Sequence, residues 1–171
     1  MNNYTSLAKS AVENYIEHGK IIAPFQDLPK EFSEKAGVFV TIKKEGQLRG
    51  CIGTYLPTKE NIAEEIIHNA IAAAIEDYRF TPIQKEELPN LSYVVYILNE
   101  PEFVKDTKKL NPKKYGIIVK TEDSKRAGLL LPDLENIDTI EQQISIACQK
   151  GEIDLKKENI LIYRFTVKKY E

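Results

Sequence analysis

The chain has 171 residues, of which 42% are hydrophobic and 29% charged, so we expect one globular domain over residues 1–171 with a sizeable core. Its net charge of −2 at pH 7 excludes the overall basic character of proteins that bind nucleic acid or anionic membranes. Two distant cysteines make no disulfide framework, and no apolar run is long enough for a leader or a membrane span, so we expect a cytoplasmic protein with reduced thiols.

The first part of the sequence predicts a helix followed by a hairpin. Apolar residues recur every three or four positions over residues 4–18, as on one face of an amphipathic helix. Residues 37–43 alternate in the period of a strand, and a second strand is expected over residues 48–55. The Glu45-Gly46 turn joins them, so the two strands should pair antiparallel.

Residues 58–76 give the strongest helix signal in the chain. Isoleucines and alanines form one wide apolar stripe, Thr58 is the expected N-cap, and Pro82 prevents continuation. Residues 91–98 are apolar on both faces, which predicts a central strand covered on two sides.

The C-terminal part is expected to begin with a polar connection over residues 99–114. Asp138 and Glu141 resemble a capping box that opens a helix ending at Lys150. The remaining strands are expected at residues 115–120, 127–131 and 160–167. Hairpins are antiparallel, so this order favours an α+β fold in which helices flank a mostly antiparallel or mixed β-sheet, rather than a doubly wound parallel sheet.

One predicted strand carries an unusual group of residues: Arg49, Gly50, Cys51 and Gly53. Side chains alternate along a strand, which places Arg49 and Cys51 on one face with their Cα atoms roughly 6.6 Å apart. A guanidinium near a thiol favours the reactive thiolate. The glycines indicate a bulge, a bend or a close approach of another group to the backbone. Cys51 is therefore a candidate nucleophile, and Arg49 a candidate anchor for an anionic group.

Asp77 and Arg79 are the second candidate pair. Asp77 follows the end of the predicted helix, where the helix dipole opposes negative charge, so it should have a cationic partner. Either Arg79 or Arg49 could supply that charge. The structural alternative to direct catalysis is an ion pair that fixes the chain at the C-terminal end of the helix. Thr54 lies close to these elements and could donate a hydrogen bond to a ligand.

Each candidate also has a structural interpretation. Cys51 could be a small buried hydrophobe, as most cysteines outside disulfides are, and Arg49 could form a structural ion pair. Cys148 lies on the apolar face of its predicted helix and is expected to be inert core. The basic cluster is expected to be a solvated loop and consists of Lys105, Lys108, Lys109, Lys113 and Lys114. The spacing of His and Cys predicts no metal site, and no glycine-rich loop predicts a cofactor.

Two motifs resemble the AMMECR domain family. The stretch Leu48–Thr54, with its Arg-Gly-Cys-Ile-Gly core, is similar to the hallmark strand of that family. Residues 70–82 resemble its alanine-rich helix, which ends in Asp-x-Arg-Phe-x-Pro. Weaker matches continue in order through most of the 171 residues. The resemblance implies an α+β fold with two unequal lobes and a cleft between them, and an association with Memo-type and radical-SAM proteins.

These observations together predict a small enzyme acting on an anionic small molecule or a modified macromolecule. Cys51 is the expected catalytic residue, and no metal or other cofactor is expected. The expected substrate-binding residues are Arg49, Gly50, Gly53, Thr54, Asp77 and Arg79. The competing hypothesis is a non-catalytic adaptor that binds a partner protein, and a nucleic-acid-related binding module ranks third. We expect no membrane partner, and nucleic acid is the least favoured partner.

Overall fold

The computed structural model describes residues 2–171, which form two compact units. The first unit extends to Leu98 and also contains Lys168–Glu171, while the second comprises Asn99–Val167. The chain therefore leaves the first unit once and returns to it at its C-terminal end. Each unit combines helices with an antiparallel sheet, so the predicted α+β class is confirmed. None of the helices among residues 2–171 is both long and apolar enough to cross a membrane.

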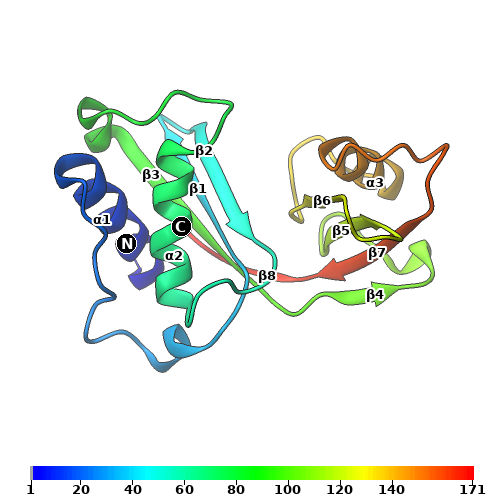
Figure 1. Cartoon of the computed structure of the whole chain (residues 1–171), viewed down its shortest axis with the longest axis horizontal. Coiled ribbons are helices and arrows are strands. Elements are labelled where there is room, and N and C mark those ends of the chain that lie inside the picture. Colours follow the sequence, from blue (N-terminus) through cyan, green and yellow to red (C-terminus); the bar gives the residue numbers. More distant parts are fainter. Residues whose placement is uncertain (1) are drawn as a thin grey trace. The chain divides into compact units, whose positions relative to one another are not determined.

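The first unit is built on a four-stranded sheet with the order β2-β1-β3-β8 (Figure 1). Its strands are β1 (Val38–Lys44), β2 (Gln47–Thr54), β3 (Leu91–Leu98) and β8 (Val167–Tyr170). The predicted hairpin is confirmed, because β1 pairs antiparallel with β2 from Val38 opposite Thr54 to Lys44 opposite Gln47. β2 lies at one edge of this sheet, so one side of its backbone has no neighbouring strand.

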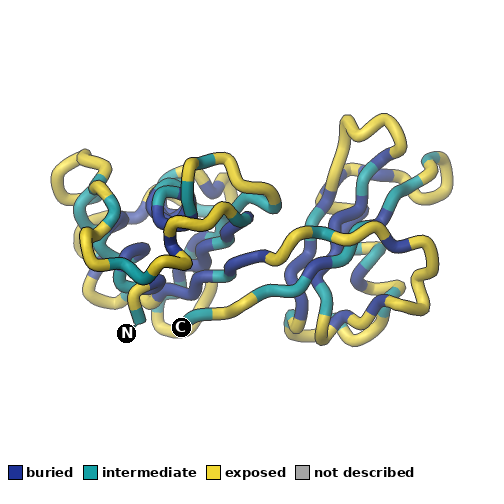
Figure 2. The backbone as a smooth tube through the Cα atoms, turned by 90° about the horizontal axis from the view of Figure 1, so that it is seen from below, coloured by how far each residue is buried: buried dark blue, intermediate teal, exposed yellow. Residues whose placement is uncertain are grey.

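Helices α1 (Asn3–His18) and α2 (Ile62–Ile75) cover one face of this sheet (Figure 1). The apolar stripe predicted for the second helix is buried here, including Ile66 and Ile67. Val40 contributes to the same core from the sheet. In Figure 2 the buried stretches follow these helices and strands, whereas the exposed stretches lie mainly in the connections. Two short 3₁₀ helices complete the unit, η1 (Lys30–Ser33) and η2 (Lys85–Asn90).

The second helix begins later than the sequence predicts. Its N-cap is Asn61, whose side chain accepts a 2.9 Å hydrogen bond from the backbone N–H of Glu64. Thr58 instead donates its hydroxyl to Glu65 at 2.8 Å and remains in the preceding loop. The prediction of Thr58 as the N-cap was wrong. Threonine and asparagine both suit an N-cap position, so residue type alone does not decide between Thr58 and Asn61. The buried Glu65 decides it, because it accepts the Thr58 hydroxyl hydrogen bond and holds Thr58 in the loop.

The second unit contains a sheet with the order β4-β7-β5-β6, and helix α3 (Ile140–Lys150) packs on it. Its strands are β4 (Glu102–Val104), β5 (Gly116–Thr121), β6 (Ala127–Leu130) and β7 (Ile160–Phe165). Cys148 is buried in its core as predicted, and burial raises the pKa of its thiol. A 3₁₀ helix, η3 (Thr107–Lys109), follows β4.

Three predictions for this part of the chain need correction. Strand β4 and helix η3 lie within 99–114, which the sequence indicated as a polar connection. The strand predicted over 160–167 is divided into β7 and β8, which join different sheets. The capping box of α3 uses Thr139 and Gln142, each one residue after the pair predicted from the sequence. Its spacing is that of the predicted box, so the pattern alone did not fix the register.

Candidate active site around Cys51

Cys51 lies on the face of the first sheet that is opposite to the helices. Its cross-strand partner is Thr41, which alternates with the buried Val40 and Ile42 that face α1 and α2. The Thr41 hydroxyl donates a hydrogen bond to the Cys51 sulfur, with an Oγ1 to Sγ distance of 3.2 Å. Cys51 is half-buried, so its thiol is less enclosed than that of Cys148. A hydroxyl that donates to sulfur favours the thiolate over the thiol.

Asp77 and Arg79 cover the open backbone edge of β2 at Cys51. The Cys51 N–H donates to Asp77 Oδ2 at 2.9 Å, and Arg79 Nη2 lies 3.5 Å from the Cys51 carbonyl oxygen. The two side chains thus take the positions that a neighbouring strand would supply, one accepting and one donating. Asp77 follows the C-terminus of α2, where the helix dipole disfavours a negative charge. The N–H of Cys51 at the strand edge offsets this by donating a hydrogen bond to the Asp77 carboxylate.

The carboxylate and the guanidinium also form a two-point ion pair. Arg79 Nε donates to Asp77 Oδ1 at 2.9 Å, and Nη2 donates to Oδ2 at 2.7 Å. The hydrogen bonds from Arg79, assisted by the Cys51 N–H, outweigh the effect of burial and hold the pKa of Asp77 at about 2. The pKa of Arg79 is raised, first by its hydrogen bond to Asp77 and also by the negative charge of that carboxylate, although burial opposes this.

Arg49 has a different partner, which the sequence did not indicate. Its Nε and Nη2 donate to the two oxygens of Glu87 in η2 at 3.0 and 2.8 Å, and Lys44 donates to the same carboxylate at 2.9 Å. The hydrogen bonds from Arg49 lower the pKa of Glu87 to about 2, although burial opposes this. Of the two arginines considered for Asp77, therefore, only Arg79 pairs with it, and Arg49 pairs with Glu87.

The register of β2 explains why Arg49 is directed to Glu87. Gly50 is opposite Ile42 and Leu48 is opposite Lys43, so Arg49 is an extra residue in a β-bulge. A bulge redirects side chains, and the alternation that placed Arg49 beside the Cys51 thiol is interrupted at this point. The guanidinium that does interact with the cysteine backbone is that of Arg79.

Phe80 links the two ion pairs. Its ring centroid lies 5.9 Å from Cζ of Arg49 and 5.5 Å from Cζ of Arg79, within the range of cation–π attraction. The structure therefore brings Arg49, Cys51, Asp77 and Arg79 into one neighbourhood, with Phe80 between the two guanidinium groups.

The two glycines are required by close packing. A Cβ atom on Gly50 would lie 2.1 Å from the carbonyl oxygen of Ala73 in α2. A Cβ atom on Gly53 would lie 2.3 Å from the Phe39 ring and 2.4 Å from the Val38 carbonyl oxygen. The absence of a side chain at both positions thus lets another group approach the strand, as the sequence suggested. In the structure that group is the α2 backbone at Gly50 and strand β1 at Gly53.

Thr54 belongs to a second hydrogen-bond network, centred on the buried Glu65. The Thr54 hydroxyl donates to Glu65 Oε1 at 2.7 Å, and the backbone N–H groups of Thr58 and Lys59 donate to Oε2 at 2.7 and 2.8 Å. Burial raises the pKa of Glu65, but these hydrogen bonds outweigh it and the pKa is lowered. Glu65 thereby holds the loop that follows β2 against helix α2.

Replacing Thr54 with valine should destabilise the protein by about 1–3 kcal/mol, because the side chain keeps its shape while the buried carboxylate loses one donor. The free energy of unfolding measured with urea would test this. Thr5→Val is a suitable control, since Thr5 is also buried but its hydroxyl bonds to Asn2 at the start of α1 and not to a buried carboxylate. A Thr54→Val protein as stable as the wild type would mean that this hydroxyl is available for a ligand.

Sequence reasoning missed Thr41, Phe80 and Glu87 as components of this site. Each is adjacent to a predicted site residue in space, but Glu87 is far from Arg49 along the chain. Among residues 2–171, no three His, Cys, Asp or Glu side chains are grouped in a way that could hold a metal ion.

Comparisons with known proteins place this chain in a family. A family model described as AMMECR1 matches residues 5–170. A protein from Thermotoga maritima is 50% identical over 170 residues, which are 98% of this chain and 97% of that protein. A protein from Clostridium acetobutylicum is 43% identical over 170 residues, and there the chain spans 36% of the longer protein.

A solved structure supports the same relationship. The crystal structure of an uncharacterized protein from Pyrococcus horikoshii matches this fold with a TM-score of 0.90 and 33% sequence identity. The match covers 97% of this chain and 88% of that one. Because the family model spans nearly all of the sequence and the Thermotoga protein matches over almost its full length, this chain belongs to the AMMECR1 family.

Proposed function

We propose that this protein is a small thiol enzyme, in which Cys51 reacts with an electrophilic, anionic substrate beside Arg79. The observation that carries the proposal is the hydrogen bond from the Thr41 hydroxyl to the Cys51 sulfur, next to the Arg79 guanidinium, which lies 3.5 Å from the Cys51 carbonyl oxygen. Both groups favour the nucleophilic form of cysteine. After its proton has left to solvent, the thiolate would form a bond to an electrophilic carbon of the substrate, and the leaving group would depart with the electrons of the bond that breaks. We expect this reaction in the cytoplasm, where thiols stay reduced.

The exposure of the two arginines supports Arg79 as the anion anchor. The side chain of Arg79 is 45% exposed, whereas that of Arg49 is only 13% exposed and is held by both oxygens of Glu87. Arg79 can therefore direct its remaining N–H groups to a ligand without leaving Asp77. In this proposal Arg49 fixes η2 and Phe80, while Gly50, Gly53 and Thr54 set the position of the strand.

The test compares how fast Cys51 reacts with a neutral and an anionic reagent. In a Cys148→Ala background, iodoacetamide and iodoacetate each form an S–C bond at Cys51 as iodide leaves with the bonding electrons. Arg79→Gln should slow both reactions roughly three- to tenfold at neutral pH by raising the thiol pKa, with partial screening by solvent. It should slow iodoacetate more than iodoacetamide, because the anion also loses its attraction to the guanidinium. Rates are measured by mass spectrometry.

Lys35→Gln is the matched control, since it removes one positive charge from an exposed residue of the same unit. Equal rates for Arg79→Gln and Lys35→Gln would contradict the proposed role of Arg79. If Cys51 in the folded wild-type protein reacts no faster than the buried Cys148, the thiol is structural and the enzyme proposal is wrong.

A partner-binding role has one observation in its favour. Tyr78 is 96% exposed, although it lies between Asp77 and Arg79 in the loop that covers the β2 edge. Tyrosine and arginine are enriched where protein interfaces concentrate their binding energy. The adaptor hypothesis therefore has Tyr78 binding a partner protein, with Memo-type and radical-SAM proteins as the candidates suggested by the family resemblance.

A titration distinguishes the two roles. If the protein is an adaptor, Tyr78→Ala should weaken binding of a purified Memo-type protein about tenfold or more, without changing the rate of Cys51 alkylation. Exposed Phe25, in the same unit, is mutated to alanine as the control. Unchanged affinity in the Tyr78→Ala protein would exclude this surface as the interface.

A further inference from the structure

The second unit contains two adjoining cavities that share Arg164. The larger has a volume of about 320 Å³ and is lined by residues that include Lys114, Tyr115 and Thr166. The smaller has a volume of about 240 Å³ and is lined by Phe103, Val104, Lys105, Lys109 and Arg164. Three of these five residues are cationic and one is aromatic, so the smaller cavity combines positive charge with an apolar surface.

Arg164 is held in a fixed position between the cavities. Its Nη1 donates to the backbone carbonyl oxygen of Lys109 at 3.0 Å, and its Cζ lies 4.5 Å from the ring centroid of Tyr115. Tyr115 is held in turn by the buried Gln143 of α3, whose Nε2 donates to the Tyr115 carbonyl oxygen at 2.7 Å. The guanidinium is therefore oriented before any ligand arrives, which reduces the entropy lost on binding.

Aromatic side chains of β4 and β7 lie on the other face of this sheet from Arg164, because Phe103 is opposite Tyr163 and Glu102 is opposite Arg164. The Phe103 ring is 49% exposed and lies 5.5 Å from the ring of Tyr163, over which Lys120 is placed at 5.4 Å. Lys105 and Lys109, which the sequence suggested were part of a solvated loop, line the cavity beside Phe103. The cavity therefore lies at the outer edge of β4, where residues of both faces meet, and this grouping is absent from the linear sequence.

We propose that this surface of the second unit binds a nucleotide. Its phosphate would lie against Lys105, Lys109 and Arg164, and its base would extend around the edge of β4 to stack on the exposed ring of Phe103. Phosphates are bound by such cationic groups, and bases stack on aromatic rings without requiring a particular sequence. The same chemistry is offered by a free nucleotide and by a single-stranded nucleic acid.

Glu102 supplies Arg164 with a counter-charge that a ligand could displace. Arg164 Nε and Nη2 both donate to one oxygen of Glu102, at 3.2 and 3.1 Å. The Glu102 side chain is 69% exposed, so it can move into solvent when a phosphate takes its place. The site is built entirely from the second unit, whereas Cys51 and its partners belong to the first, so the two proposals stand or fall separately.

Binding is tested with a fluorescein-labelled, single-stranded oligouridylate of about ten nucleotides, within the size range of single-strand sites. Fluorescence anisotropy measures its affinity for the full-length protein at several salt concentrations. Phe103→Ala should weaken binding by about 5- to 150-fold, the range measured when one stacked base loses its aromatic partner. The double variant Lys105→Gln, Lys109→Gln should weaken binding and also reduce the dependence of affinity on salt, because fewer counterions are released.

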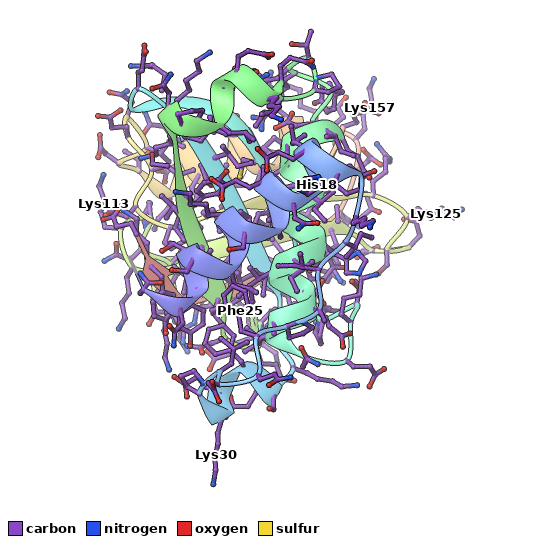
Figure 3. All side chains as sticks on the ribbon, turned by 90° about the vertical axis from the view of Figure 1, so that its left-hand side faces the viewer. His18, Phe25, Lys30, Lys113, Lys125 and Lys157 are labelled. Carbon is purple, nitrogen blue, oxygen red and sulfur yellow. The ribbon has the colours of Figure 1, made fainter. Side chains whose placement is uncertain are left out.

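Matched controls separate the site from general effects of charge and exposure. Phe25→Ala removes another exposed phenylalanine, and Lys125→Gln with Lys157→Gln removes two exposed charges of the second unit; Figure 3 labels these three residues. Circular dichroism shows whether each variant is folded. If Phe103→Ala and Phe25→Ala bind equally, or the two lysine pairs have equal effects, the proposal is wrong.

Competition identifies the form of the ligand. Displacement of the labelled strand by ATP at a similar concentration of phosphate groups would indicate a free nucleotide, and retention of the strand would indicate a nucleic acid. Displacement by tripolyphosphate as effectively as by ATP would show that the base is not recognised and would overturn the stacking role of Phe103. Absence of binding by both the strand and ATP would overturn the proposal as a whole.

Discussion

Replacing Gly50 with alanine is expected to lower the free energy of unfolding by about 3 kcal/mol or more, which is at or above the usual range for overpacking. The added Cβ would lie 2.1 Å from the carbonyl oxygen of Ala73 and 3.1 Å from its carbonyl carbon. Both atoms are helix backbone, so α2 must move away from β2 as a body. The reduced entropy of the unfolded chain would offset only about 0.4–1 kcal/mol of this cost. Urea unfolding followed by circular dichroism measures the change.

Gly19→Ala is the control, because Gly19 has a φ of 66° but no heavy atom within 4 Å of its Cβ position. It should cost only about 1–2 kcal/mol, from the left-handed backbone alone. The movement of α2 should also separate Asp77 from the Cys51 N–H and so change the alkylation rate of Cys51. A Gly50→Ala protein as stable as the wild type would show that helix and strand are not in this close contact.

The sequence predicted those parts of the fold that depend on local pattern. The hairpin and the stripe containing Ile66 were correct because burial of one face enforces a period of two or of 3.6 residues. Strand β4 was missed because three residues, Glu102–Val104, are too few to show any period. The local pattern suggested one domain, and two lobes were implied only by the family resemblance, because the partition into two units depends on the return of β8 to the first sheet.

The sequence predicted which residues belong to the site better than it predicted which of them pair with one another. The composition of the β2 strand drew attention to Arg49 and Cys51, and the helix dipole required a partner for Asp77. The actual pairing, Arg79 with Asp77 and Glu87 with Arg49, depends on a bulge at Arg49. A bulge leaves no reliable mark in a single sequence, and Glu87 comes from an element that tertiary packing alone brings close.

Acidification should remove about 5 kcal/mol of stability through two carboxylates of this site. The folded pKa of Asp77 is about 2 against an ordinary 3.8, and that of Glu87 is about 2 against 4.5. At 1.36 kcal/mol for each pKa unit, these differences correspond to about 2 and about 3 kcal/mol. Because both pKa values are lowered, the stabilisation is fully present above about pH 5 and is lost as the pH falls from there through 2. Urea unfolding at a series of pH values measures the effect.

The double variant Asp77→Asn, Glu87→Gln should be less stable than the wild type at pH 7, because Arg49 and Arg79 lose their anionic partners. Its stability should then fall about 5 kcal/mol less than that of the wild type between pH 6 and pH 2, since the carboxyl groups that would take up protons are absent. Glu60→Gln, which removes an exposed carboxylate of the same unit, should leave the pH dependence close to that of the wild type. Parallel curves for the double variant and the wild type would show that neither ion pair stabilises the folded protein, and that the β2 edge is held by packing at Gly50 and Phe80 instead.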